Sequence, residues 1–267
     1  MATAPPTPTL YVILGSHACR TGMLLLEHKG ISYRTVELVT GLHPVGVRLR
    51  GFPGNAGAVR DVDGRRTASL AMADRLGTVP ALAIGGERVQ SNRKIARFLD
   101  RLQPDPPLFP ADPELRRAVE EAERWGDEVF QMAARRLVLA AGLHGRDAMR
   151  RRGNDGRLGP LLFQREPVRF AFVHSLARFT FGANPETERE LLAALPAMLD
   201  RIDSWIDAGV LGGESLNAAD YMLVTSLALI DYRTDLHPEM AERPAGALVE
   251  RVLPEPARPP EPAPSPT

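Results

Sequence analysis

The sequence is poor in cysteine and in long apolar runs, and its charges balance. Its 267 residues contain one cysteine, Cys19, so no disulfide can form within the chain, as in proteins of a reducing compartment. The net charge of zero gives no electrostatic reason to expect nucleic acid or an anionic membrane as partner. No apolar run approaches the ~20 residues of a membrane-spanning helix, and the opening residues MATAPPTPT do not read as a signal peptide. We therefore expect a cytoplasmic protein without nucleic-acid or membrane partners.

Lysine is also scarce. Of the 33 basic residues only Lys29 and Lys94 are lysines, a bias typical of a GC-rich bacterial genome such as that of an actinobacterium. The apolar fraction of 44% and the charged fraction of 25% are those of an ordinary globular protein. The length is enough for one large or two small domains with a real core.

Residues 10–30, LYVILGSHACRTGMLLLEHKG, predict a buried strand followed directly by a helix. Leu10–Leu14 is a run of large apolar residues, Gly15 and Ser16 interrupt it, and helical spacing follows up to Gly30. A helix that begins directly after a strand presents free N–H groups and its positive dipole end at the sheet edge. The first helical turn is therefore a candidate anion site.

Residues 77–100 predict a strand, a Gly-Gly hairpin, a second strand, a polar turn and a helix. Together with a strand at Ile31–Leu38, this is the element order of a thioredoxin-like domain. The proline-rich segment QPDPPLFPADP then marks a domain boundary. Long amphipathic and apolar helices follow, one of them opened by a capping arrangement of Asn217 and Asp220.

Two motifs in this order resemble those of the cytosolic glutathione S-transferases. The segment Ser16–Arg20 (SHACR) is similar to the S-x-P-C-R signature of the theta and delta classes, with Ala18 in place of the proline. Val79-Pro80 is similar to the family's Val-Pro pair, whose proline is cis and exposes the preceding backbone to a thiol ligand. The resemblance implies an α/β thioredoxin-like N-terminal domain followed by an all-α domain of the glutathione S-transferase C-terminal type.

The expected organisation has two ordered domains between two disordered ends. Residues 53–76 are longer than the family's usual connection and form either a lid or a tolerated surface insertion. The expected ranges are a disordered 1–8, a thiol-binding domain 9–103, a linker 104–111, an all-α domain 112–250 and a disordered proline-rich tail 251–267.

Ser16 and Cys19 are the candidate catalytic residues. The resemblance implies that the Ser16 hydroxyl stabilises a bound thiolate, whereas on spacing alone Ser16 is a helix cap, and the two roles can coexist. Cys19 is either a small buried residue or a monothiol nucleophile; without a leading cysteine, dithiol cycling is excluded.

The candidate thiol-binding residues come from three segments. His17 and Arg20 flank the catalytic pair; His17 is expected in a solvent-facing loop, and Arg20 faces either the ligand or solvent. Val79 and Pro80 provide the backbone contact. The acidic-or-Gln plus Ser pair that the family uses at the next helix N-terminus corresponds either to Gln90 and Ser91 or to Ser91 and Asn92.

The resemblance implies a transferase that activates glutathione or another low-molecular-weight thiol, such as mycothiol, for attack on a small electrophile, and it implies a homodimer. The alternatives are a thiol-dependent isomerising, cyclising or cleaving enzyme, or a non-catalytic ligand-binding protein on the same scaffold. No metal-ligand cluster is visible in the sequence, so no metal is expected. The expected wall of the electrophile pocket is Trp125, Phe130, Met132 and Arg135.

Overall fold

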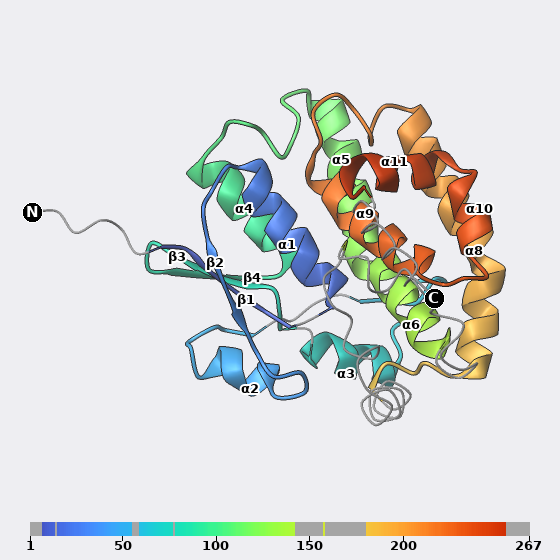
Figure 1. Cartoon of the computed structure of the whole chain (residues 1–267), viewed down its shortest axis with the longest axis horizontal. Coiled ribbons are helices and arrows are strands. Elements are labelled where there is room, and N and C mark those ends of the chain that lie inside the picture. The colour runs from blue at the N-terminus through green and yellow to red at the C-terminus, as the bar shows by residue number, and fades with distance from the viewer. Residues whose placement is uncertain are drawn as a thin grey trace, which may run out of the picture.

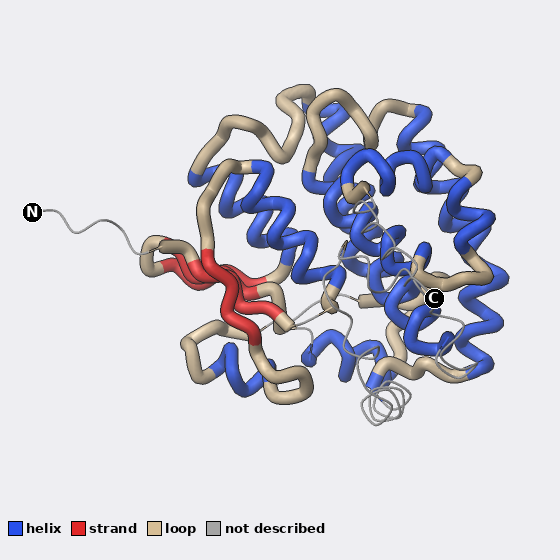
Figure 2. The backbone as a smooth tube through the Cα atoms, in the orientation of Figure 1, coloured by secondary structure: helices blue, strands red, loops and turns tan. Residues whose placement is uncertain are grey.

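A computed structural model of the chain describes residues 7–13, 15–54, 59–76, 78–141, 157 and 180–254. The Arg- and Gly-rich sequence of 144–160 predicts a loop, and that of Phe163–Phe181 a helix or helix pair. The first range lies outside the described residues except for Arg157, and the second lies almost wholly outside them. A small sheet with its helices occupies one half of the molecule and a bundle of helices the other (Figure 1, Figure 2). The thioredoxin-like domain followed by a helical domain, as predicted from the sequence, is confirmed.

The sheet has four strands in the order β2-β1-β3-β4. β1 is parallel to β2 and antiparallel to β3, and β3 is antiparallel to β4. The hairpin turn is made by Gly85 and Gly86, with φ of 56° and 90°, a left-handed conformation that glycine adopts without steric cost. The elements of this half are β1 (Thr9–Val12), α1 (His17–His28), β2 (Arg34–Glu37), α2 (His43–Arg48), α3 (Ala68–Leu76), β3 (Ala81–Ile84), β4 (Glu87–Gln90) and α4 (Asn92–Leu102).

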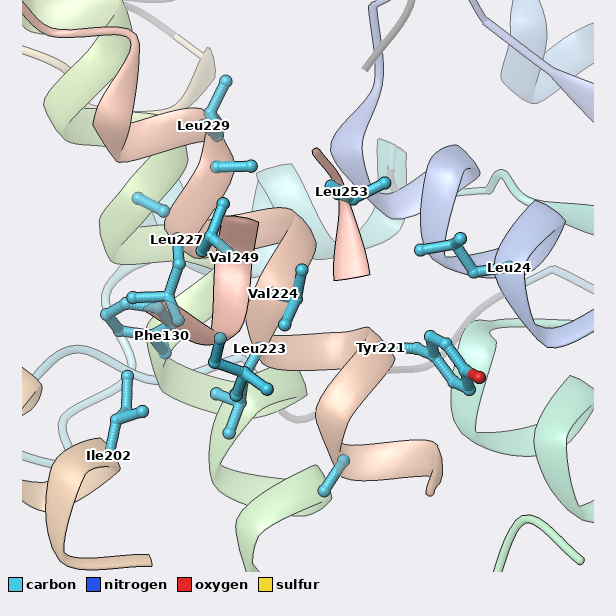
Figure 3. Packing of buried hydrophobic residues seen from close by; sticks show 14 of the residues in the cluster. Leu24, Phe130, Ile202, Tyr221, Leu223, Val224, Leu227, Leu229, Val249 and Leu253 are labelled. Atoms are coloured by element: carbon cyan, nitrogen blue, oxygen red, sulfur yellow. The ribbon is translucent and has the colours of Figure 1, made fainter. Parts of the chain in front are cut away.

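The helical half is packed around α9, whose fourteen residues are all buried. Asn217 and Asp220 form the predicted capping box: the Asn217 side chain accepts from Asp220 N, and the Asp220 carboxylate accepts from Asn217 N at 2.8 Å. Figure 3 shows α9 side chains meeting Phe130 and Ile202 on one side and turning Tyr221 toward the thioredoxin-like half on the other. The elements are α5 (Pro113–Trp125), η1 (Gly126–Phe130), α6 (Gln131–Ala141), α8 (Pro185–Asp207), α9 (Ala218–Asp231), α10 (His237–Ala241) and α11 (Pro244–Val252).

The long helix predicted after the linker is interrupted by a π-helical turn, η1, between α5 and α6. Gly126 opens this turn where the chain passes close to α9: a Cβ there would lie 2.9 Å from Met222 Cγ and 3.1 Å from a Leu223 methyl. π-turns inside α-helices change which side chains face a neighbouring cleft and are frequent at functional sites. Here the turn sets the direction of Asp127.

Polar contacts fasten α1 to α9 and join the two halves. The Thr21 hydroxyl lies 2.7 Å from that of Thr225, and His28 Nδ1 lies 2.9 Å from the Tyr221 hydroxyl. Both contacts are buried or partly buried, so they hold α1 in a fixed position beside the helical half. The N-terminus of α1 is thereby held at the junction of the two domains.

The described part of the 53–76 segment bridges the two halves. Arg60 N donates to Glu128 O at 2.7 Å, and Arg136 Nη1 lies 3.3 Å from an Asp61 oxygen. Leu70 and Ala73 of α3 form a small apolar cluster with Met132 of α6. This segment is therefore attached to the helical domain at several points.

Candidate functional site

Ser16 is the N-cap of α1 and stands where β1 gives way to the helix. Its Oγ accepts a hydrogen bond from Cys19 N at 3.3 Å, which is the capping role expected from its position. The same hydroxyl lies within hydrogen-bonding reach of the Cys19 sulfur, whose pKa it lowers, so a bound sulfur anion would compete with Cys19 for its proton. The side chain is half-buried, and the positive end of the α1 dipole lies beside it.

Cys19 is 1% exposed and lies in the apolar core under the first turn of α1. Burial raises the pKa of its thiol, and the nearby Ser16 hydroxyl and Arg135 only partly offset that effect. A buried thiol with a raised pKa is a poor nucleophile. Of the two readings of Cys19, the structure favours the small buried residue, and Ser16 is the group able to contact a ligand.

The peptide bond between Val79 and Pro80 is cis, as predicted. Within the described part of the chain, neither the N–H nor the C=O of Val79 has a hydrogen-bond partner. We call this exposed pair of backbone groups the Val79 notch. Pro80 packs against α1, since a Cβ on Gly22 would lie 3.1 Å from Pro80 Cβ. The notch and the first turn of α1 therefore belong to one site.

Ser91 joins the site from β4 and α4. Its N–H lies 3.4 Å from Pro80 O. Ser91 is the N-cap of α4, and among the described non-glycine residues it is the one with a positive φ, 71°. Such backbone conformations cost about 1–3 kcal/mol and concentrate at functional sites. Within the described residues no side chain caps α4, which leaves its first N–H groups available to an anion.

The neighbours of Ser91 have structural partners. Gln90 is buried, its Oε1 accepts from Gly54 N at 2.8 Å, and its Nε2 donates to Thr78 O at 2.8 Å. Asn92 is buried and donates to Ala18 O at 2.9 Å. The Gln90 side chain is therefore not the ligand contact that the Gln90 and Ser91 alternative assigns to it. It joins the end of β4 to Thr78, the residue before the notch. Ser91, at the turn between β4 and α4, remains a candidate ligand contact.

Two expectations for the SHACR segment are corrected. His17 is the first residue of α1 and only 2% exposed, so it is not in a solvent-facing loop. Burial and the positive charge of Arg135 hold its pKa well below the usual range, and its Nε2 is buried without a partner in the described structure. Arg20 points along α1 and pairs with Glu27 at 2.8 Å, which engages its guanidinium away from Ser16.

The four residues expected to line an electrophile pocket separate into two groups. Trp125 and Phe130 stack with ring centroids 5.2 Å apart, and Phe130 is fully buried in the helical core. Phe130 is therefore core and not an open pocket wall, which corrects the expectation for this residue, whereas Trp125 is half-buried at the edge of that core. Met132 faces α3, whereas the half-buried Arg135 influences the pKa of both His17 and Cys19. Arg135 is therefore the member of the set that faces the first turn of α1.

Asp127 lies in the π-turn and has no local pattern in the sequence that marks it as a functional residue. Burial raises its pKa to about 7; the opposing effect of Arg93 is weaker, and the carboxylates of Glu123, Glu128 and Asp74 raise the pKa further. A carboxyl group that titrates near neutrality can exchange protons under physiological conditions. Asp127 is thus an acid of this kind at the domain junction, and the arginine near it is Arg93.

The raised pKa of Asp127 predicts a pH-dependent effect of Asp127→Asn on stability. In the unfolded chain an aspartate titrates near pH ~4, so the folded state binds more protons between that pH and about pH 7. Stability is lost as the pH rises through this window. Because Asn keeps the uncharged shape, the variant should be more stable than the unaltered protein by roughly 1–3 kcal/mol at about pH 8, after allowance for partial solvent exposure. The difference should vanish near pH ~4. Urea unfolding at both pH values tests this, and an equal difference at both would contradict it.

No group of three or more His, Cys, Asp or Glu side chains among the described residues is arranged to hold a metal ion. Within the same ranges, no helix combines the length and the apolar content needed to cross a bilayer.

Comparison with protein families finds a match in the N-terminal part of the chain. Residues 10–107 match the family model of the glutathione S-transferase N-terminal domain, a range that contains Ser16, the Val79 notch and Ser91. The sequence matches no curated protein.

Solved structures extend the likeness to the helical half. A glutathione transferase from Phanerochaete chrysosporium superposes with a TM-score of 0.61 at 19% identity, over 95% of this chain and 100% of that one. A glutathione S-transferase from Ceriporiopsis subvermispora in complex with glutathione gives 0.57 at 19% identity, over 93% and 97%. A GST-like protein from Pseudomonas syringae gives 0.56 at 16% identity; the alignment covers 93% of this chain and 66% of that one. The chain thus has the two-domain fold of these proteins, and its residues 10–107 match the model of the glutathione S-transferase N-terminal domain.

Proposed function

We propose that the protein is an enzyme that binds glutathione or a related low-molecular-weight thiol and ionises it beside Ser16. The observation that carries the proposal is the convergence at one sheet edge of three features: the half-buried hydroxyl of Ser16, the Val79 notch and the uncapped N-terminus of α4. A peptide-like thiol can pair with the notch as an added strand. Its acidic end then meets the α4 N–H groups, and its sulfur meets Ser16.

The chemistry at Ser16 follows from this placement. The thiol loses its proton to solvent, and the Ser16 hydroxyl donates a hydrogen bond to the resulting thiolate while the α1 dipole favours its negative charge. The sulfur electron pair forms a bond to an electrophilic carbon, and the leaving group departs with the electron pair of the broken bond. Holding both reactants at the domain junction supplies the proximity that a bimolecular reaction lacks in solution. The theta- and delta-like motif and the glutathione-bound fungal relative support this assignment.

Calorimetric titration with glutathione and with S-methylglutathione tests the binding half of the proposal. Both compounds should bind, because the notch and the α4 N-terminus contact groups other than the sulfur. Glutathione should bind more tightly as the pH rises through the pKa of its bound thiol, whereas S-methylglutathione should show no such dependence. Arg20→Gln is the matched control and should bind both as the unaltered protein does, since Arg20 pairs with Glu27. Failure of both compounds to bind would contradict the proposal.

A further inference from the structure

Arg135 is a half-buried arginine of α6 that has no carboxylate partner among the described residues. Each of the other buried or half-buried arginines in that part of the chain forms an ion pair with an Asp or Glu side chain. They are Arg20, Arg93, Arg97, Arg136, Arg157, Arg233 and Arg243. An arginine taken out of water is normally paired in this way, because the lost hydration of the cation is otherwise not offset.

The charge of Arg135 is only weakly compensated. Burial lowers the pKa of its guanidinium to about 10, and the Cys19 thiol and the Asp127 carboxyl oppose that effect only in part. A cation in this state gains more from a bound anion than an arginine that is already paired or fully hydrated. Guanidinium groups bind carboxylates through two parallel, charge-assisted hydrogen bonds. Arg135 is therefore one half of an ion pair whose other half a ligand can supply.

The immediate neighbours of the guanidinium are apolar. Arg135 Cζ lies over the Phe181 ring, 5.4 Å from its centroid, and Arg135 Nη1 lies 3.9 Å from Met132 Sδ. Met132 and Phe181 belong to the apolar cluster that α6 forms with α3. A ring face and a thioether are weak acceptors, so they hold the guanidinium in place without neutralising it. Its N–H groups remain available to a stronger acceptor.

Arg135 faces the first turn of α1, which follows Ser16. Its charge acts on His17 and Cys19 of that turn and on His43 at the start of α2. Figure 1 shows α6 in the helical half, running past the end of α1 near the centre of the view. His17 Nε2, at the same junction, is buried without a partner among the described residues, so it too calls for a ligand atom or a water.

This position suits the second substrate of the proposed reaction. The thiol is held by the thioredoxin-like half, at the Val79 notch and the N-terminus of α4. The electrophile therefore approaches the sulfur at Ser16 from the helical half, which carries Arg135.

We infer that the electrophile used by this protein carries a carboxylate, which Arg135 binds while the sulfur at Ser16 attacks a carbon of the same molecule. The inference rests on the proposed function and names the class of its second substrate. Arg135 selects and positions the electrophile. The bonds that form and break are those of the conjugation described above, so no additional chemical step is involved.

Calorimetry of the full chain with three unreactive conjugates tests the inference without a chemical step. The probes are S-methylglutathione, S-(4-carboxybenzyl)glutathione and its neutral match, S-(4-carbamoylbenzyl)glutathione. The carboxylate conjugate should bind about 10-fold more tightly than the amide conjugate to the unaltered protein, as expected for a charge-assisted contact. In Arg135→Gln the ratio of the two dissociation constants should fall to about one. Arg124→Gln, the same change at an exposed position of α5, should keep a ratio of about 10.

A third variant separates charge from geometry. Arg135→Lys keeps the positive charge but not the paired N–H groups, so its ratio should lie between those of the unaltered protein and Arg135→Gln.

The outcomes separate the inference from the proposed function. Binding of S-methylglutathione with equal affinities for the two benzyl conjugates, or with no binding of either, would overturn the inference alone. A ratio of about 10 that survives in Arg135→Gln would also overturn it. Absence of binding by all three conjugates would overturn the inference and the proposed function together. Because the readout is a ratio within each protein, a variant with altered stability still gives a decisive answer.

Discussion

Replacing Ser16 by alanine is expected to lower kcat/KM for thiol conjugation by about 100- to 1,000-fold, the usual cost of removing one donor to a developing anion. The hydroxyl of Ser16 is a side-chain donor at the first turn of α1, where its neighbour is the buried Cys19 thiol with a raised pKa. Without it the bound thiol keeps a higher pKa, so less thiolate is present near neutral pH. Steady-state rates with an activated aryl halide measure the effect.

Two variants control for the loss of the cap. Ser16→Ala also removes the bond to Cys19 N, which should cost only about 1 kcal/mol of stability. Ser16→Thr keeps a hydroxyl and should retain most of the activity. Cys19→Ala should react close to the unaltered protein, because the Cys19 thiol is buried and its pKa is raised. Full activity of Ser16→Ala, or loss of activity confined to Cys19→Ala, would contradict the assignment.

Replacing Lys29 by methionine should destabilise the fold by about 3–5 kcal/mol, as expected when one partner of a buried ion pair is removed. Lys29 is 1% exposed; its ammonium donates to Asp100 at 2.8 Å, to Gln103 O at 2.7 Å and to Pro106 O. This cluster ties the end of α1 to α4 and to the linker between the domains. Removing the ammonium leaves a partly buried carboxylate and two carbonyls without their shared donor.

The second lysine provides the control. Lys94 is exposed on α4, so Lys94→Met should change the free energy of unfolding by less than about 0.5 kcal/mol. Denaturant unfolding of both variants gives the comparison. A cost below about 1 kcal/mol for Lys29→Met would show that the buried cluster does not hold the domains together.

The thioredoxin-like half could be predicted because each of its signals is local. A short apolar run and the Gly85-Gly86 turn each specify their element within a few residues, as the capping pair of Asn217 and Asp220 does for α9 in the helical half. The order of those elements then leaves few arrangements. The cis peptide at Pro80 followed from the resemblance and agrees with the structure.

The missed features depend on contacts between residues far apart in the sequence. His17 is buried because α6 of the other domain, which carries Arg135, lies near the first turn of α1, and no local pattern specifies that. An apolar helical stripe looks the same in a core and in a pocket wall, so the sequence does not reveal that Phe130 is fully buried. The π-turn at Gly126 reflects close packing against α9, which the sequence of α5 alone does not reveal.

The pKa of the bound thiol is the most direct measure of the central claim that Ser16 stabilises a sulfur anion. Glutathione bound to the protein is titrated by the ultraviolet absorbance of its thiolate, in parallel with Ser16→Ala and Ser16→Thr. The account predicts a thiol pKa well below that of free glutathione in the unaltered protein and in Ser16→Thr, and a return toward the free value in Ser16→Ala. The same lowered pKa in Ser16→Ala, or an unchanged pKa on binding to the unaltered protein, would contradict it.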